Sequence, residues 1–266
     1  MQPDLDLIAE TFSARAASYA LSHWHKRCAE RLVELSRLRQ GDHVLDAATG
    51  TGFAAFAAAR AVGRKGHVRG VDISPGMLRE ARATLENSGL TNMEFIEADA
   101  VRMPHLPDKT FDAVTCAAGL LYMSATDALR EWYRLLKENG HVAFSTMRAG
   151  SPKAGRIFRE CAAALGVSLR DPSEPLGSAS ACRLALEAAG FETVEIVEEP
   201  ITFTPEDLSR AWDSNFRSPA HADVRRLTDD EQRALKSMYL SALAREEAHN
   251  PEALSRSDVL YAMGRR

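Results

Sequence analysis

The sequence predicts an α/β fold, with a Rossmann-like, mostly parallel sheet and helices on both faces. The first indication is residues 44–61, where a short apolar run containing an acid is followed by a glycine-rich turn and an Ala/Phe-rich run. This pattern is typical of a buried strand, a tight turn and a helix. The second is that two further strand-like runs end at or just before an acid, Asp72 and Asp99. The third is that helical runs separate these strands, as in a sheet of βα units.

The composition is that of an ordinary globular protein. A length of 266 residues suits one large α/β domain, or a core with a sizeable insertion. With 45% hydrophobic and 26% charged residues, the chain is not expected to be disordered. The net charge of -4 gives no general reason to expect a nucleic-acid partner.

The cysteines and the N-terminal residues favour a cytoplasmic location. Residues 1–20 contain charges throughout and lack the apolar centre of a signal peptide. No stretch approaches the ~20 uninterrupted apolar residues of a membrane span. The cysteines form no Cys-x-x-Cys pair, which argues against a disulfide framework or a zinc site; they are Cys28, Cys116, Cys161 and Cys182.

Two helices are expected before the first strand. Residues 4–20 form the first, and residues 22–38 the second, with Ser22 as a candidate N-cap. Their apolar faces are expected to consist of Leu5, Ile8, Phe12 and Tyr19 in the first and Leu32, Leu35 and Leu38 in the second.

The glycine turn has two interpretations. Gly50-x-Gly52-x-x-Ala55 matches the dinucleotide fingerprint, in which a pyrophosphate rests on free amides at the helix N-terminus, and this predicts an NAD(P)-dependent oxidoreductase. However, Asp46 lies near the carboxyl end of the strand, so its carboxylate is expected to face the ligand and repel a pyrophosphate. A phosphate-free ligand with a sulfonium and an ammonium group, such as S-adenosylmethionine, would be attracted instead.

Two later acids extend this site. Asp72 lies about twenty residues beyond the glycine turn, where an acid can accept both ribose hydroxyls; the alternative is an acid at a helix N-cap. Ile73 and Met77 would then contact the adenine. Asp99 could accept from the adenine amine, and the amide of Ala100 could donate to a ring nitrogen. Because parallel strands end at one sheet edge, these acids and Asp46 are expected to meet in one crevice.

At the motif Asp46-Ala-Ala-Thr-Gly50-Thr-Gly52 the chain resembles the class I S-adenosylmethionine-dependent methyltransferases, whose first motif is an acid followed by Gly-x-Gly. Thr49 departs mildly from the Cys or Ser that is commoner there. Residues 111–114 resemble the family's FD-x-V fourth strand. Residues 136–146 resemble its LKPGG turn and fifth strand, and Asn139-Gly140 keeps the capacity for positive φ that this turn requires. The resemblance implies a seven-stranded sheet whose last strand is antiparallel and lies between the fifth and sixth.

The resemblance also implies the cofactor, S-adenosyl-L-methionine, with S-adenosyl-L-homocysteine as product. Small residues at the end of the fourth strand would lie against its methionine portion. An aromatic residue of the N-terminal helices would lie near the donor, although Tyr19 packing on the core is an equal alternative. The residues expected to bind the cofactor are Tyr19, Asp46, Ala47, Thr49, Gly50, Gly52, Asp72, Ile73, Met77, Asp99, Ala100, Ala117 and Ala118.

Beyond residue 147 the pattern is less regular. Helices are expected at 153–165 and 180–189, an alternating strand at 191–197, a long helical insertion at 201–257 and a closing strand at 259–264. We therefore expect residues 1–40 to form a helical segment or lid, 41–200 the cofactor-binding core, and 258–266 the closing strand of that core. By elimination, residues 201–257 form a cap that carries the acceptor site.

The expected function is methyl transfer to an O, N or C atom of a small molecule. The resemblance is to the branch that includes ubiquinone and menaquinone biosynthesis enzymes and natural-product methyltransferases, so a quinone precursor or secondary metabolite is a candidate acceptor. The Asn-Pro-Pro-Tyr signature of DNA adenine methylation is absent at residues 116–119. Two alternatives remain: a binder of the same cofactor that is non-catalytic or catalyses a non-methylating reaction, and the oxidoreductase. The protein is expected to be a monomer or homodimer.

A general base is needed only if the acceptor must lose a proton. The candidates are His23, His25, Tyr122 and His221, and for each histidine a packing or solvated role is the alternative. Because His23 and His25 are two residues apart on a helix, at most one should face the pocket. The histidines are not clustered, so no metal site is expected.

Overall fold

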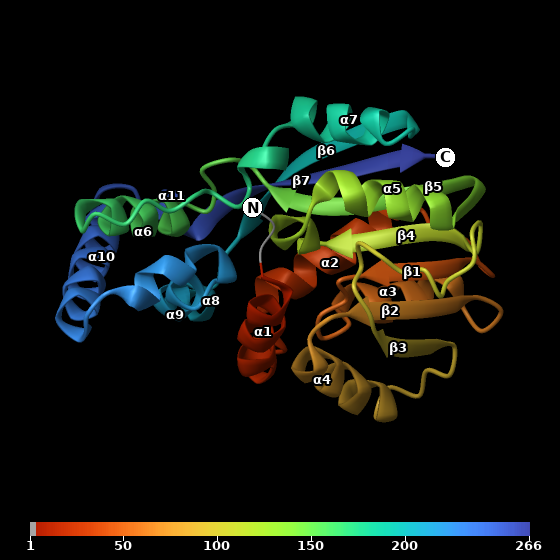
Figure 1. The fold of residues 1–266 in the computed structure, drawn as a ribbon, viewed down its shortest axis with the longest axis horizontal. Coiled ribbons are helices and arrows are strands. Elements are labelled where there is room, and N and C mark those ends of the chain that lie inside the picture. The colour runs from red at the N-terminus through yellow and green to blue at the C-terminus, as the bar shows by residue number, and fades with distance from the viewer. Residues whose placement is uncertain (1–3) are drawn as a thin grey trace.

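The computed structural model describes residues 4–266 and contains one seven-stranded sheet, in the order β3-β2-β1-β4-β5-β7-β6 (Figure 1). β1 to β5 pair in parallel, whereas β7 is antiparallel to both β5 and β6. This confirms the expected place and direction of the closing strand. The strands are β1 (His43–Ala47), β2 (His67–Asp72), β3 (Met93–Glu97), β4 (Phe111–Ala117), β5 (Leu136–Met147), β6 (Glu192–Thr202) and β7 (Arg256–Arg265).

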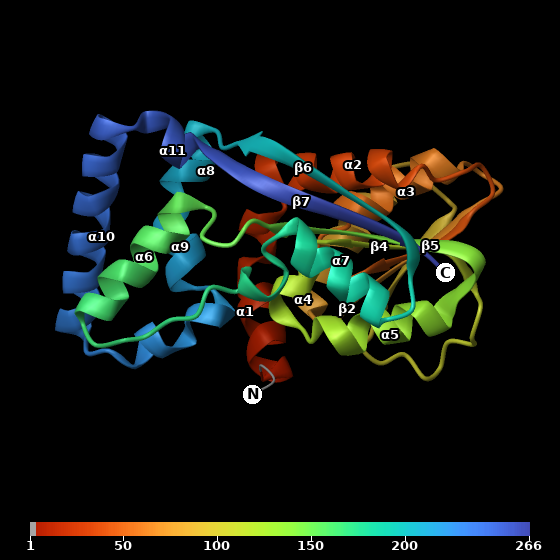
Figure 2. The ribbon, with the colours of Figure 1, turned by 90° about the horizontal axis from the view of Figure 1, so that it is seen from above.

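Helices cover both faces of the sheet (Figure 2). One face carries α2 (His23–Ser36), which packs mainly on β4 and β5, and α3 (Phe53–Val62) and α4 (Pro75–Glu86), which bury alanine and branched aliphatic side chains against β1, β2 and β3. The other carries α5 (Ala125–Leu135) and α7 (Ala179–Ala188), whose largest buried side chain is Trp132. The α/β class predicted from the alternation of strands and helices is confirmed.

Capping side chains and turn residues define several of the ends of these helices and strands. Ser74 caps α4 by accepting from the Met77 amide at 3.2 Å, and a proline occupies the first turn. Ser124 caps α5 by accepting from the Asp127 amide. Ser22 precedes α2 but makes no side-chain capping bond, because its hydroxyl bonds His25 Nδ1 at 2.7 Å instead. Near the start of β5, Asn139 adopts the expected positive φ, 63°.

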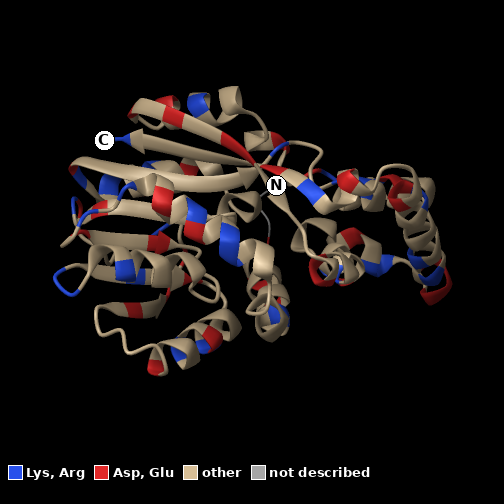
Figure 3. Ribbon diagram, turned by 180° about the vertical axis from the view of Figure 1, so that it is seen from behind, with Lys and Arg blue, Asp and Glu red and all other residues tan. Residues whose placement is uncertain are grey.

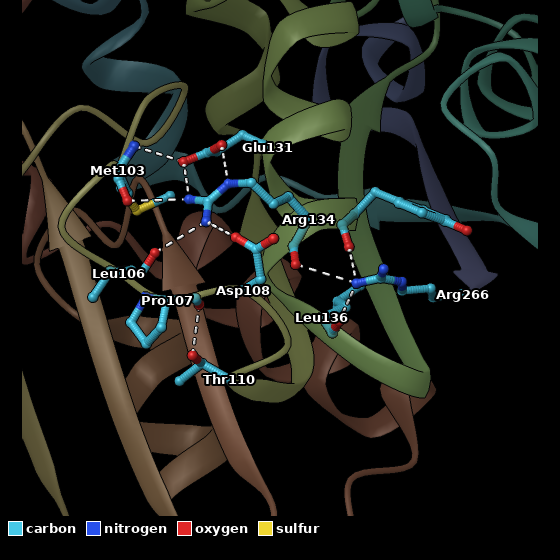
Figure 4. Close-up of polar contacts among 10 residues, drawn as sticks. Met103, Leu106, Pro107, Asp108, Thr110, Glu131, Arg134, Leu136 and Arg266 are labelled. Atoms are coloured by element: carbon cyan, nitrogen blue, oxygen red, sulfur yellow. Dashed lines mark hydrogen bonds and ion pairs between the residues drawn. The ribbon is translucent and has the colours of Figure 1, made fainter.

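The loop after β3 is fastened to α5 by polar contacts (Figure 4). The Arg134 guanidinium donates to the carbonyl oxygens of Leu106 and Met103, at 3.0 and 3.2 Å, and pairs with Glu131 at 2.7 Å. Glu131 in turn accepts from the Met103 amide at 2.7 Å. Trp132 Nε1 donates to the Ala100 carbonyl at 2.8 Å. These bonds hold the backbone beside Asp99 and Ala100 against a buried helix.

A second group of helices stands beyond the carboxyl edge of the sheet (Figures 1 and 2). It comprises α6 (Lys153–Ala164), α8 (Pro205–Ser209), α9 (Ala211–Phe216), η3 (Pro219–Arg226), α10 (Asp229–His249) and α11 (Pro251–Ser255), and we call it the cap. The cap has its own apolar cluster, in which Phe158 and Tyr239 are fully buried. α6 contributes to this cluster, so the cap uses residues 153–164 as well as the insertion at 201–257.

Helix α1 (Leu5–Tyr19) lies between the sheet and the cap (Figure 2). It packs closely on the start of α4: Ser13 Oγ lies 2.9 Å from Ser74 Oγ and accepts from the Gly76 amide at 3.1 Å. A Cβ at Gly76 would lie 2.5 Å from the Ser13 Cα, so glycine permits this approach. Among residues 4–266, none of the helices combines the length and the apolar character needed to cross a bilayer.

Candidate functional site

A cavity of about 240 Å³ lies between the carboxyl edge of the sheet, α1 and the cap. Most of the residues predicted for the site line it: Tyr19, His25, Gly50, Asp72, Ile73, Met77, Asp99, Ala100, Ala117, Ala118, Tyr122 and His221. Asp46 and Thr49 line a smaller adjoining cavity instead, and Ala47, Gly52 and His23 line neither. The fold thus brings twelve of the seventeen predicted positions to one space.

The glycine turn is closed by its own hydrogen bonds. The Gly50 amide donates to Asp72 Oδ2 at 2.8 Å, and the Gly52 amide donates to the Thr49 carbonyl at 2.9 Å. Gly52 has a φ of 92°, and a Cβ there would lie 2.8 Å from the Phe56 ring, so only glycine fits. The Gly50 amide is therefore already bonded to a carboxylate at the end of the next strand.

Asp46 does not face the main cavity, in contrast to the expectation. Its carboxylate is 1% exposed and accepts from Thr49 Oγ1 at 2.6 Å and Thr115 Oγ1 at 2.8 Å. Burial raises its pKa to about 6, although these hydroxyls and the Ala55 amide favour the charged form. The two threonines turn the side chain inward, where its charge lies beneath the turn and beside the N-terminal end of α3.

Asp72 and Asp99 lie on the main cavity from neighbouring strands. Asp72 Oδ1 accepts from the Ser74 amide at 2.9 Å, and burial raises the pKa of its carboxyl. Asp99 Oδ1 accepts from the Val101 amide at 2.9 Å. Each carboxylate oxygen can accept more than one bond, so both keep acceptor capacity toward the cavity. Ala118, at the end of β4, adopts a φ of 58° and exposes backbone with little side chain.

Aromatic side chains of α1 and α2 cover the glycine turn. Tyr19 lies so close that a Cβ at Gly50 would be 3.7 Å from its ring, and its ring centroid is 6.2 Å from that of Phe53. The centroid of the His25 ring is 4.1 Å from that of Tyr19 and 3.5 Å from that of Trp24. Burial raises the pKa of the Tyr19 phenol and, with the nearby Arg15 charge, lowers that of His25. Both side chains are therefore uncharged near neutral pH.

The remaining base candidates lie in different places. His23 is exposed on α2, 3.6 Å from Glu206, while its neighbour His25 lines the cavity. Tyr122, in η1 (Gly119–Tyr122), packs edge to face on Phe12 with centroids 5.0 Å apart. His221 lies in the cap, 3% exposed, and burial lowers its pKa to about 4.

Several cavity residues had no sequence signal. Arg15 of α1 and Arg159 of α6 are the cationic side chains on the wall, and Asp171 and Asn215 lie at the cap end. None belongs to a motif, and they come together only through the packing of α1 and the cap. Within the part of the chain that the structure describes, no group of three or more His, Cys, Asp or Glu side chains is placed to hold a metal ion.

Comparison with known proteins identifies the sheet-edge half of this site. Residues 44–140 match the family model described as a methyltransferase domain. The ubiquinone/menaquinone biosynthesis C-methyltransferase of Pseudomonas putida is 39% identical over 143 residues, which cover 51% of this chain and 56% of the relative. The chain therefore spans about half the length of the curated relatives it matches.

Solved structures resemble the chain over a greater length. The YcgJ protein of Bacillus subtilis has a TM-score of 0.59 at 19% identity, covering 90% of this chain and 98% of its own. Haemonchus contortus phosphoethanolamine N-methyltransferase 2, in complex with S-adenosylhomocysteine, has a TM-score of 0.54 at 19% identity, covering 86% and 49%. At such identities the likeness extends to the fold alone. These matches do not support the oxidoreductase alternative; over residues 44–140 they support the predicted resemblance to the class I S-adenosylmethionine-dependent methyltransferases.

Proposed function

We propose that this protein transfers a methyl group from S-adenosyl-L-methionine to a small-molecule acceptor, releasing S-adenosyl-L-homocysteine. The observation that carries the proposal is that the anion-binding elements of the glycine turn are already occupied by carboxylates. Asp72 accepts from the Gly50 amide at 2.8 Å, and Asp46 lies at the N-terminal end of α3. A pyrophosphate would meet two carboxylates there, whereas a cationic ligand is attracted.

The cavity residues fit the parts of this cofactor. Asp72 would accept the two ribose hydroxyls, and Asp99 the exocyclic amine of adenine. The Ala100 amide has no hydrogen-bond partner among residues 4–266 and would donate to an adenine nitrogen. Ile73 and Met77 would flank the ring, and Ala117 and Ala118 would lie along the methionine portion. The set supplies acceptors for the hydroxyls and the amine and apolar contacts for the ring.

When bound, S-adenosylmethionine supplies an electrophilic methyl group on a positively charged sulfur. The chain's own contribution is alignment and exclusion of water. Tyr19, Trp24 and His25 close the cavity over the glycine turn with uncharged rings. Asp46, deprotonated above pH 6, contributes a negative charge from behind the turn without contacting the acceptor.

The acceptor would enter from the cap side, and we assign residues 201–257 together with α6 to its binding. In this scheme residues 1–40 act as a lid, although residues 1–3 lie outside the described part of the chain. Residues 41–200 other than α6, together with 258–266, would hold the cofactor. The function named for the Pseudomonas putida relative makes quinone precursors the first acceptors to test.

We further propose that the protein acts in the cytoplasm, as a monomer or homodimer, without a nucleic-acid partner. The support for the last point is the charge pattern: acidic and basic residues are interspersed along the ribbon (Figure 3), and the net charge is -4.

The proposal is tested by titrating the protein with S-adenosylmethionine, S-adenosylhomocysteine and NAD⁺ in a calorimeter. We expect the first two to bind and NAD⁺ not to bind. Turnover is then followed as S-adenosylhomocysteine release with a panel of quinols, phenols and amines. Binding of NAD⁺ in preference to S-adenosylmethionine would refute the proposal. Tight cofactor binding with no turnover on any acceptor would favour the non-methylating alternative.

A further inference from the structure

His221 lies at the cap end of the cavity, and one of its ring nitrogens is an unpaired hydrogen-bond acceptor among residues 4–266. The side chain is 3% exposed, and its ring stacks on Phe158 with centroids 5.2 Å apart and planes 23° from parallel. Nδ1 lies 3.0 Å from the Asn215 carbonyl oxygen. Because a carbonyl oxygen only accepts, Nδ1 carries the proton, and Nε2 of the neutral ring presents a lone pair.

Nε2 of His221 is buried and has no hydrogen-bond partner among residues 4–266. Leaving a buried acceptor without a donor costs free energy, so native proteins pair nearly all such atoms. His221 also lines the cavity. A donor on a molecule bound in the cavity would supply the missing bond.

The carboxylates at the same end of the cavity already accept hydrogen bonds from neighbouring groups. Asp171 accepts from the Gly150 amide at 2.7 Å and from Arg159 at 2.9 Å. Asp207 accepts from both the amide and the hydroxyl of Thr204, each at 2.9 Å. Arg15 and Arg159 on the cavity wall balance the charges of these two carboxylates, so the region offers a cationic amine no excess negative charge, which favours a neutral donor.

The wall between His221 and the sheet edge is largely apolar. It is formed by side chains of α1, the end of β5, the start of the insertion and α11, namely Phe12, Met147, Phe203, Leu208 and Leu254. Such a wall favours a ligand with an apolar body by the hydrophobic effect.

We propose that Nε2 of His221 accepts a hydrogen bond from a hydroxyl group of a neutral, largely apolar methyl acceptor. This bond would select hydroxylated methyl acceptors over apolar molecules of the same shape. This inference rests on the proposed methyltransferase function, in which the bound molecule receives the methyl group. It assigns His221 a binding role rather than proton abstraction.

The test compares two probes that share an apolar body, 2-naphthol and 2-fluoronaphthalene. Their affinities for the full chain are measured by fluorescence titration, with and without saturating S-adenosylhomocysteine. We expect 2-naphthol to bind about tenfold more tightly, as one net hydrogen bond allows. In His221→Asn the side-chain amide can still donate to the Asn215 carbonyl, but the acceptor at Nε2 is lost. The preference should then fall to about onefold.

His105→Asn is the matched control, because His105 is exposed and lies outside the cavity. It should keep the preference of the unaltered protein. Equal affinities of the two probes for the unaltered protein, or an undiminished preference in His221→Asn, would overturn the proposal.

A measurement on the unaltered protein covers the case in which His221→Asn does not fold. In protein labelled with ¹⁵N-histidine, 2-naphthol should shift the Nε2 resonance of His221, and 2-fluoronaphthalene should not. Equal responses to both probes would overturn the proposal. The probe preference and S-adenosylhomocysteine binding are separate readouts, so loss of one with retention of the other shows which of the two proposals has failed.

Discussion

Replacing Asp46 with asparagine should change how stability depends on pH. In the folded protein the pKa of this carboxyl is about 6, against an ordinary 3.8, with burial as the main cause. At 1% exposure there is little solvent screening, so the rise corresponds to about 3 kcal/mol. A raised carboxyl pKa means that the folded state holds the proton more tightly. Its stabilising contribution is therefore complete below about pH 4 and is lost as the pH rises through 6.

Asparagine does not titrate, so Asp46→Asn lacks this loss. The free energy of unfolding of the variant, minus that of the unaltered protein, should increase by roughly 2 kcal/mol between pH 4.5 and 7.5. Urea denaturation followed by circular dichroism at several pH values measures this difference. Placing an amide beside the two threonine hydroxyls has a cost that does not depend on pH, so it does not affect how the difference in free energy changes with pH.

Asp112→Asn provides a control of opposite sign. Lys137 and the His43 amide, at 2.8 Å each, lower the pKa of the Asp112 carboxyl despite its partial burial. That carboxyl stabilises the fold at higher pH, and its contribution is lost as the pH falls. The difference between Asp112→Asn and the unaltered protein should therefore decrease with rising pH. A flat or decreasing trend for Asp46→Asn would refute the description of Asp46 as a desolvated carboxyl.

Three further substitutions, with Gly89→Ala as a control, test the cofactor half of the site. Asp72→Ala should weaken S-adenosylmethionine binding by ~1–3 kcal/mol in calorimetry through loss of charged acceptors, and unchanged affinity would remove Asp72 from the site. Gly52→Ala should lower the free energy of unfolding by ~1–3 kcal/mol, because the backbone is strained and the Cβ clashes. Gly89→Ala, with a φ of 70° but open space, should cost less in the same urea titration. Trp132→Phe removes the bond to Ala100 and should lower both stability and cofactor affinity by ~1 kcal/mol; stability loss alone would show that the loop position does not matter.

The fold could be predicted to a large extent because its signals are local. The strands ending near Asp72 and Ala117 and the glycine turn at Gly50 are visible in short windows of sequence, and the structure has them there. The place of β7 in the sheet came from the resemblance, because no local pattern states which strands become neighbours.

The direction of the Asp46 side chain could not be predicted in the same way. It depends on Thr115, which lies 69 residues away and faces Asp46 only through the β1–β4 register. The residues at the proposed acceptor end of the cavity could not be predicted from the sequence either. Arg159, Asn215 and His221 come from α6, α9 and η3, and these elements meet through the packing of the cap rather than through a motif.

The insertion leaves the sheet from β6 and returns as β7, and the two strands pair at its base through Thr202 and Arg256. Whatever length of chain lies between these two residues, its ends are held at a fixed separation by main-chain bonds that do not depend on side-chain identity. Changes in residues 203–255 can therefore accumulate with little effect on the strands that bear Asp72 and Asp99. Under the proposed function, evolution or a protein engineer can replace residues 203–255 to accommodate a new acceptor while the part proposed to bind the methyl donor stays as it is.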